Sequence, residues 1–367
     1  MSNNLSLEKR YNSIDISRAL AIVCMVTVHT FIFWSKLGFS LERDIVYFIG
    51  GLAAPFFLIT SGISFYILLT KKIYENRLKK EIFVIVLKRA IFIFIVSTLF
   101  QIFFGSYFGM KISFIIYWSV FQVIAFSMIL FFYIPFFKFK IRLAVYFLAI
   151  SIIFLLDFII NFYEIELLFL LVEGTFEFIP YANFFLLGVF ISDLIINLSE
   201  SQFNKILLVF ILLGLLSNLF LFILGNLFKS NYFSFVLKFI RYTGIFLIIF
   251  SISFYFTDIK KSDFIFKQIL IKWGKLSFSL YYIHFILLGI AYLFYPLLFN
   301  NSILSGYLIY EYIILLLLFF LIYEITLRIW KKFDYKFGLE WFMNIFVKKS
   351  LFINIKNMMS NKNNIKD

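Results

Sequence analysis

Long apolar stretches alternate with short polar segments along almost the whole chain. A helix of about 20 residues crosses the hydrocarbon core of a bilayer. Because a segment in lipid must satisfy its own backbone hydrogen bonds, each stretch is predicted to be an α-helix. Ten spans are predicted, at residues 15–34, 45–69, 91–108, 114–134, 143–163, 180–198, 206–225, 238–256, 275–296 and 306–327.

The polar segments between these spans carry an uneven distribution of positive charge. With the N-terminus in the cytoplasm, 28 of the 34 Lys and Arg residues fall on the inner side and 6 on the outer side. Cytoplasmic loops of membrane proteins are rich in Lys and Arg, and the opposite orientation would invert the ratio. The sequence therefore predicts an all-α, polytopic protein of the cell membrane, with about ten transmembrane helices and with both termini cytoplasmic.

Composition supports the same class of protein. Of the 367 residues, 63% are hydrophobic and 15% are charged, whereas a soluble domain has roughly 25% charged residues. The net charge of +14 belongs to the inner loops, so we predict membrane lipids rather than nucleic acid as partners. We expect one integral-membrane domain over 1–340 and a cytoplasmic tail over 341–367, which begins as an interfacial helix and ends disordered.

The first span contains three ionisable residues, Asp15, Arg18 and His29. Arg18 and His29 lie eleven residues apart, about 20° from three whole helical turns, so they share one face, with a rise of about 16 Å between them. Asp15 can pair with Arg18 one turn later. Arg18 could instead snorkel to the interface and His29 could bond a neighbouring helix, but ionisable groups inside a membrane are candidates for a functional site.

The second of the two histidines, His284, is predicted at a similar depth, about 14 Å above the inner surface on the ninth span. Two histidines at one depth predict a shared polar site with His29, and the neighbouring Tyr281 is a candidate for binding the substrate. We predict no metal, because two histidines without a nearby Cys or carboxylate motif cannot complete a zinc site.

A long cytosolic ligand suits a site with an arginine at its mouth and a base about 16 Å deeper. Acyl-CoA has that shape, and histidine, which titrates near neutral pH, is a natural base for an attacking hydroxyl or amine. The richest inner loop is also a candidate to bind the CoA phosphates, although it could equally be a topology signal or contact anionic headgroups. Its candidate residues are Lys71, Lys72, Lys88 and Arg89.

Candidates to bind the acceptor lie on the outer side. The segment over 163–181 contains four Glu and no Lys or Arg, so Glu177 could attract an amino sugar. Lys238 and Arg241, at the outer end of the eighth span, are either interface anchors or ligands for an anionic acceptor such as a lipid-linked sugar.

Four segments resemble transmembrane acyltransferases. "RYNSIDISRALAIVCMVTVH" (10–29) is similar to the opening of this superfamily, whose signature is an arginine, ten residues and a histidine, here Arg18 and His29. "GGLAAPFFLITSGISFYI" (50–67) and "FIPYANFFLLGVFISD" (178–193) resemble prokaryotic homologues of heparan-α-glucosaminide N-acetyltransferase (acyltransferase 3-like proteins). "GKLSFSLYYIH" (274–284) resembles a segment shared more widely in the superfamily.

The resemblance implies transfer of an acyl group, usually acetyl, from cytosolic acetyl-CoA to an extracytoplasmic glycan or lipid-linked sugar. It implies that His29 is catalytic and that Arg18 is part of the end that faces CoA. We further expect His284 to take part in catalysis by orienting the acceptor or the thioester. In the eukaryotic heparan branch the position of His29 is asparagine and a loop histidine is catalytic. The loop over 35–44 has no histidine, so the chemistry is expected to depend on His29. Ala19 replaces the usual glycine.

Two other classes fit the apolar pattern. A secondary transporter could use mid-membrane histidines for proton coupling, but transporters often have internal repeats and paired interrupted helices, and only one span, at Pro55, looks interrupted. A non-catalytic membrane scaffold is the third class. A homodimer is left open.

Overall fold

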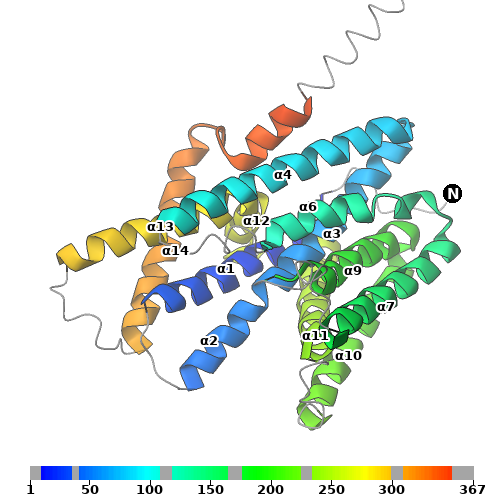
Figure 1. Cartoon of the computed structure of the whole chain (residues 1–367), viewed down its shortest axis with the longest axis horizontal. Helices are drawn as coiled ribbons and strands as arrows, with labels where there is room; N and C mark the ends of the chain where they lie inside the picture. Colours follow the sequence, from blue (N-terminus) through cyan, green and yellow to red (C-terminus); the bar gives the residue numbers. More distant parts are fainter. Residues whose placement is uncertain are drawn as a thin grey trace, which may run out of the picture.

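The computed structural model describes residues 10–34, 41–107, 118–163, 176–224, 234–298 and 309–348. Within these ranges the chain is helical and contains no strand (Figure 1). The helices of its first half are α1 (Asn12–Trp34), α2 (Leu41–Gly51), α3 (Ala53–Tyr74), α4 (Lys79–Tyr107), α6 (Val120–Leu130), η1 (Ile134–Phe136) and α7 (Phe139–Tyr163). Those of its second half are α9 (Phe178–Asn197), α10 (Glu200–Leu224), α11 (Ser234–Phe254), η3 (Tyr255–Ile259), α12 (Lys267–Lys275), α13 (Ser277–Leu298) and α14 (Ile309–Lys331).

Seven helical stretches among the described residues are long and apolar enough to cross a membrane: α1, α2 with α3, α4, α7, α9, α10, and α11 with η3. The predicted all-α, multi-pass membrane fold is confirmed. The other three predicted spans coincide with α6, α13 and α14, and the count of ten and the orientation stay predictions. The division at residue 340 also stays a prediction, and the expected disordered end lies outside the described residues.

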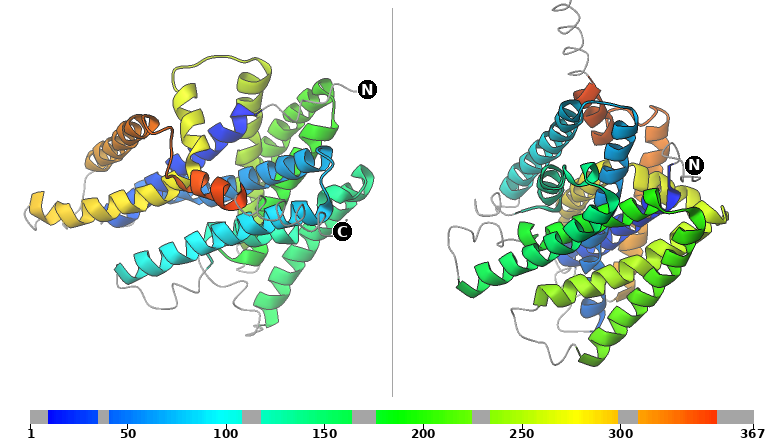
Figure 2. Two further views of the ribbon diagram at one scale, coloured as in Figure 1. Left: turned by 90° about the horizontal axis from the view of Figure 1, so that it is seen from above. Right: turned by 90° about the vertical axis from the view of Figure 1, so that its right-hand side faces the viewer.

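The helices divide into a central and a peripheral set. About four fifths of the apolar part of α9 is buried (83%), against 22% in α7 and in α10. A helix that exposes most of its apolar surface is suited to contact with lipid. The central helices α1, α3 and α9 therefore form the scaffold that holds the interior polar groups, whereas α7 packs on α9 and α10 packs on α11 at the periphery (Figure 2).

Two glycines allow the close contact between α3 and α9. A Cβ on Gly62 would lie 2.1 Å from the carbonyl oxygen of Phe185, and a Cβ on Gly188 would lie 2.0 Å from that of Ile59. No larger residue fits without moving a backbone. Small residues at such crossings let membrane helices approach closely.

The second predicted span is interrupted, as Pro55 indicates. Helix α2 ends at Gly51 and α3 begins at Ala53, so the break falls at Leu52. Pro55 lies in the first turn of α3, where a missing N–H removes no helical hydrogen bond. Figure 1 shows α2 leaving the line of α3 at this break.

Contacts from distant segments hold the start of α1. Asp258, in the π-helical turn η3, accepts hydrogen bonds from the backbone N–H groups of Asn12 and Ser13, both at 2.9 Å. These N–H groups have no partner within α1, so the carboxylate caps the helix. On another side Gly274 of α12 touches the backbone of Asp15, where a Cβ would lie 1.8 Å from the carbonyl oxygen. The start of the first span is thereby held against α12.

A buried charge cluster links α7 to α9 and α3. Arg142 donates two hydrogen bonds of 2.8 Å to the carboxylate of Asp193, which is fully buried. Tyr66 and Tyr146 donate to the same carboxylate at 2.5 and 3.1 Å, and Asn197 donates at 2.6 Å. We call these five residues the Asp193 cluster.

Candidate active site

The structure brings the two histidines together. Nδ1 of His29 on α1 lies 2.8 Å from Nε2 of His284 on α13. The rings are nearly parallel, with 6° between their planes and 5.1 Å between their centroids. His284 is fully buried and His29 is partly buried. Because a neutral imidazole has one donor and one acceptor nitrogen, one ring donates this hydrogen bond and the other accepts it.

Arg18 lies at the centre of a polar network, about three helical turns before His29 on α1. Its guanidinium donates to Asp15 at 3.2 Å and also to the hydroxyl of Ser64 on α3. Asp15 is only 2% exposed and accepts two further hydrogen bonds from Arg10, at 2.7 and 3.0 Å. The predicted pair of Asp15 and Arg18 is therefore present, with Arg10 as a third member.

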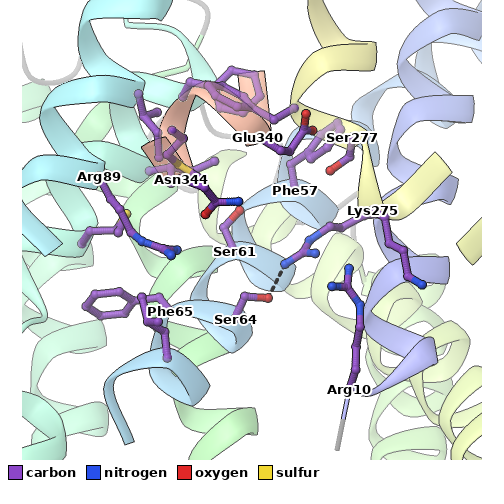
Figure 3. Close-up of a pocket in the computed structure, with 18 residues that line it drawn as sticks. Arg10, Phe57, Ser61, Ser64, Phe65, Arg89, Lys275, Ser277, Glu340 and Asn344 are labelled. Carbon is purple, nitrogen blue, oxygen red and sulfur yellow. Dashed lines mark hydrogen bonds between the residues drawn. The ribbon is translucent and has the colours of Figure 1, made fainter. Parts of the chain in front are cut away.

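A cavity of about 420 Å³ opens beside this network (Figure 3). Helices α1, α3, α4, α6 and α13 line it, together with Lys275 at the end of α12 and the short helix over 339–348. Its polar lining consists of Arg10, Arg18, Ser61, Ser64, Arg89, Lys275, Ser277, Glu340 and Asn344. Apolar side chains from α3, α4, α6 and α13 complete the wall, and they include Phe57, Phe121 and Phe278.

Positive charge exceeds negative charge around this cavity. Four cationic side chains line it, and the carboxylates of Asp15 and Glu340 oppose them. Arg10 and Arg18 share Asp15, whereas Arg89 forms no ion pair within the described part of the chain, and its buried Nε has no hydrogen-bond partner there. This excess of positive charge is complementary to an anionic ligand.

Aromatic side chains separate the cavity from the histidines. Neither His29 nor His284 lines it. The ring of Tyr281 packs against Phe121 at 4.5 Å and Phe57 at 6.3 Å, and it meets His284 at 5.6 Å on its other side. Tyr281 therefore contacts both the wall of the cavity and His284.

A comparison with protein-family models identifies the family of the chain. The model of the acyltransferase 3 family, described as an acyltransferase domain, matches residues 11–327. The chain belongs to this family of membrane acyltransferases. It is therefore a transferase enzyme that uses an acyl donor and an acceptor, and the transporter and scaffold alternatives are set aside. No curated protein matches the chain.

The prediction of a loop over 71–89 is wrong for most of its length, because α3 extends to Tyr74 and α4 begins at Lys79. The basic residues of this segment are placed unequally. Arg89 lines the cavity, whereas Lys71, Lys72 and Lys88 do not. Lys72 pairs with Glu75 at 2.7 Å at the end of α3, where Lys72 and the neighbouring Arg77 hold the pKa of Glu75 below its ordinary value. Of the four residues predicted from this segment to bind phosphate, only Arg89 is positioned to contact a ligand in the cavity.

The outer candidates form a separate group. Glu177 precedes α9, and Lys238 and Arg241 lie exposed on α11; none of the three lines the cavity. Burial and the neighbouring Asp157 raise the pKa of Glu177 to about 7, although Lys238 acts against this shift. Their predicted role in binding the acceptor stays a prediction.

Several residues of the cavity were not singled out from the sequence. Arg10 could have been found from its five-residue spacing to Asp15, and Lys275 from its place in the fourth family-like segment. Glu340 and Asn344 follow the matched family region and have no local signal. Within the described residues, no three His, Cys, Asp or Glu side chains gather as metal ligands would.

Proposed function

We propose that this acyltransferase moves an acetyl group from cytosolic acetyl-CoA to a hydroxyl or amine of an extracytoplasmic glycan or lipid-linked sugar at the cell membrane. The observation that carries the proposal is the His29–His284 pair at 2.8 Å, which lies behind a cation-rich cavity in a member of this family.

The donor end of the proposal rests on charge. CoA carries phosphates, and the cavity offers the guanidinium groups of Arg10, Arg18 and Arg89 together with Lys275. Arginine binds phosphate well because its planar fork of N–H donors matches the phosphate oxygens. The hydroxyl groups of Ser61 and Ser64 lie one turn apart on α3 and lead from Arg18 toward Phe57.

The path from donor pocket to histidine runs along α1 and α3. The helical rise from Arg18 to His29 is about 16 Å, a length that the flexible pantetheine arm of CoA can span. In the proposal the arm passes Phe57 and Phe121, and the side chain of Tyr281 turns aside to admit the thioester to the histidine pair.

The chemistry rests on the hydrogen bond between the two rings. We assign the proton of this bond to Nδ1 of His29, which donates it to Nε2 of His284, so that Nε2 of His29 carries a free lone pair. This nitrogen takes the proton of the acceptor hydroxyl or amine as the oxygen or nitrogen attacks the thioester carbonyl. The carbon–sulfur bond then breaks, and the CoA thiolate takes the proton back from His29. As an acyl carrier, the same nitrogen would instead attack the thioester carbonyl, and the carbon–sulfur bond would break to release CoA thiolate. The acceptor hydroxyl or amine would then attack the acetyl group, the bond to Nε2 of His29 would break, and the acceptor proton would pass to the CoA thiolate.

Release of CoA from acetyl-CoA tests the proposal. The purified full-length protein in detergent is incubated with acetyl-CoA and with amino-sugar or lipid-linked sugar acceptors, and free thiol is measured. His29→Ala is expected to lower the rate by 10²- to 10⁴-fold, the usual contribution of general acid–base catalysis.

The matched control is Cys24→Ala. Cys24 lies on the same helix about 140° away from His29, so this variant is expected to keep its activity. Equal thermal stability of the two variants would show that the loss is chemical. Undiminished acceptor-dependent CoA release by the His29 variant would overturn the proposal.

A further inference from the structure

The chain continues beyond the matched acyltransferase region and returns to the cavity. The family match ends at residue 327, whereas a helix over 339–348 packs beside α4, where Phe346 meets Phe92 at 5.8 Å between ring centroids (Figure 1). We call this segment the C-terminal helix. Three of its residues, Glu340, Met343 and Asn344, line the cavity. Their spacing of three and four residues places them on one helix face.

The turn before this helix sets its direction. Asp334, Tyr335 and Phe337 have left-handed backbone conformations, with φ values of 52°, 53° and 66°. Such conformations are uncommon for residues other than glycine and persist only where the surroundings hold them. The indole N–H of Trp330 donates to the carbonyl of Lys336 at 2.6 Å. The turn thus fixes the chain where it leaves α14.

Ser279 anchors the C-terminal helix to α13. Its backbone N–H donates to the carboxylate of Glu340 at 3.0 Å, and its hydroxyl donates to the same carboxylate. The backbone N–H of Leu339 donates to the Ser279 oxygen at 2.8 Å. Because Ser279 lies in the first turn of α13, Glu340 satisfies one of the N–H groups that this turn leaves unpaired. The anchor holds the polar face of the C-terminal helix over the cavity.

That polar face differs in chemistry from the rest of the lining. Glu340 is the carboxylate among the polar residues that line the cavity. Asn344 is exposed, and its side chain forms no hydrogen bond within the part of the chain that the structure describes. Figure 3 shows Asn344 and Arg89 converging on the space above Ser61. A carboxylate accepts hydrogen bonds but repels phosphate, whereas an amide both donates and accepts. These two groups therefore suit a neutral part of the ligand that carries N–H, O–H and carbonyl groups.

We infer that the C-terminal helix forms one wall of the donor site and that Asn344 and Glu340 bind the amide and hydroxyl groups of the pantetheine arm of acyl-CoA. This inference rests on the proposed function. The arginines would hold the phosphates, and the C-terminal helix would direct the arm toward Tyr281.

Binding of CoA by the full-length protein tests the inference, with Kd measured by calorimetry in detergent. Asn344→Ala is expected to weaken CoA binding about three- to tenfold, the effect of losing one hydrogen bond. Phe342→Ala is the matched control, because Phe342 lies on the opposite face of the same helix, is 44% exposed and does not line the cavity. It is expected to leave Kd within twofold.

A second variant covers Glu340, which also caps α13. Glu340→Gln removes the charge and is expected to weaken CoA binding, with the melting temperature measured in parallel to detect a folding defect. If the variant is unstable, Asn344→Ala still decides the question. Equal Kd values for Asn344→Ala and Phe342→Ala would overturn the inference while wild-type binding of CoA upheld the proposed function. Absence of CoA binding by the wild type would overturn both.

Discussion

Two groups of charged residues in this acyltransferase, one buried and one lining an open cavity, are built in opposite ways. In the Asp193 cluster one carboxylate receives hydrogen bonds from Arg142, two tyrosines and Asn197, so the charges are matched within the protein. Around Arg18, four cations line an open cavity, and Arg89 has no partner among the described residues. Both groups contact α3, and both combine arginine with aspartate.

The difference suits the Asp193 cluster to a structural role and, under the proposed function, suits the residues around Arg18 to binding a ligand. A buried charge that is fully paired has no remaining hydrogen-bonding capacity for a ligand. Removing one partner leaves the other charge buried and unpaired, which lowers the free energy of unfolding. A cavity with an excess of one sign of charge attracts a ligand of the opposite sign, because the ligand supplies the missing counter-charge. Arginine content alone therefore does not identify a ligand site; the balance of charge around each arginine does.

The largest expected effect comes from breaking the Asp193 cluster. Asp193→Ala leaves the guanidinium of Arg142 buried, with its side chain 9% exposed, and removes the acceptor of two tyrosine hydroxyls. Loss of one member of a buried ion pair costs about 3–5 kcal/mol of unfolding free energy. A markedly lower melting temperature in detergent is the expected result.

A double variant tests whether the cost comes from the unpaired charge. Replacing both Arg142 and Asp193 by leucine is expected to recover much of the stability, because an apolar pair carries no desolvation penalty. A single variant that melts like the wild type would contradict the structural role of the Asp193 cluster.

A substitution at Arg18, in the group of charges that lines the cavity, is expected to change ligand binding rather than stability. In Arg18→Gln the buried Asp15 keeps both of its hydrogen bonds from Arg10, so the melting temperature should stay near that of the wild type. Loss of a charged hydrogen-bond donor should weaken CoA binding about 10- to 100-fold. The binding should also become less sensitive to added salt, since one ionic contact is gone.

Lys72→Gln is the matched control for charge. Lys72 is also cationic and cytosolic in the predicted orientation, but it pairs with Glu75 and does not line the cavity. Its CoA affinity should match that of the wild type. Equal losses in both variants would mean that the cavity attracts CoA only through the general positive charge of the inner surface.

The local sequence pattern predicted the helices of this molecule better than it predicted the contacts between distant segments. The apolar stretches predict helices because lipid leaves the backbone few other ways to satisfy its hydrogen bonds. Helical geometry alone suggested that Arg18 and His29 share a face, and equal depth suggested that His29 and His284 meet, as they do. The cavity wall formed by Glu340 and Asn344 was not foreseeable in this way, because a left-handed turn and an anchor on Ser279 place it there.

The smallest expected effect concerns Glu177, a carboxylate that belongs neither to the Asp193 cluster nor to the lining of the cavity. Its folded-state pKa of about 7 lies above the ordinary 4.5, so its contribution to stability is fully present below pH 4.5 and is lost as pH rises through 7. Glu177→Gln should therefore raise the melting temperature at pH 8, by about 1–2 °C because the side chain is half-buried, and leave it unchanged at pH 4.5. Glu75→Gln is the contrasting control: the pKa of Glu75 is lowered by Lys72, so any effect should have the opposite sign. If both variants shifted the melting temperature in the same direction at pH 8, the contrast between the two carboxylates would be contradicted. In that contrast, burial and Asp157 disfavour the charged form of Glu177, whereas Lys72 favours that of Glu75.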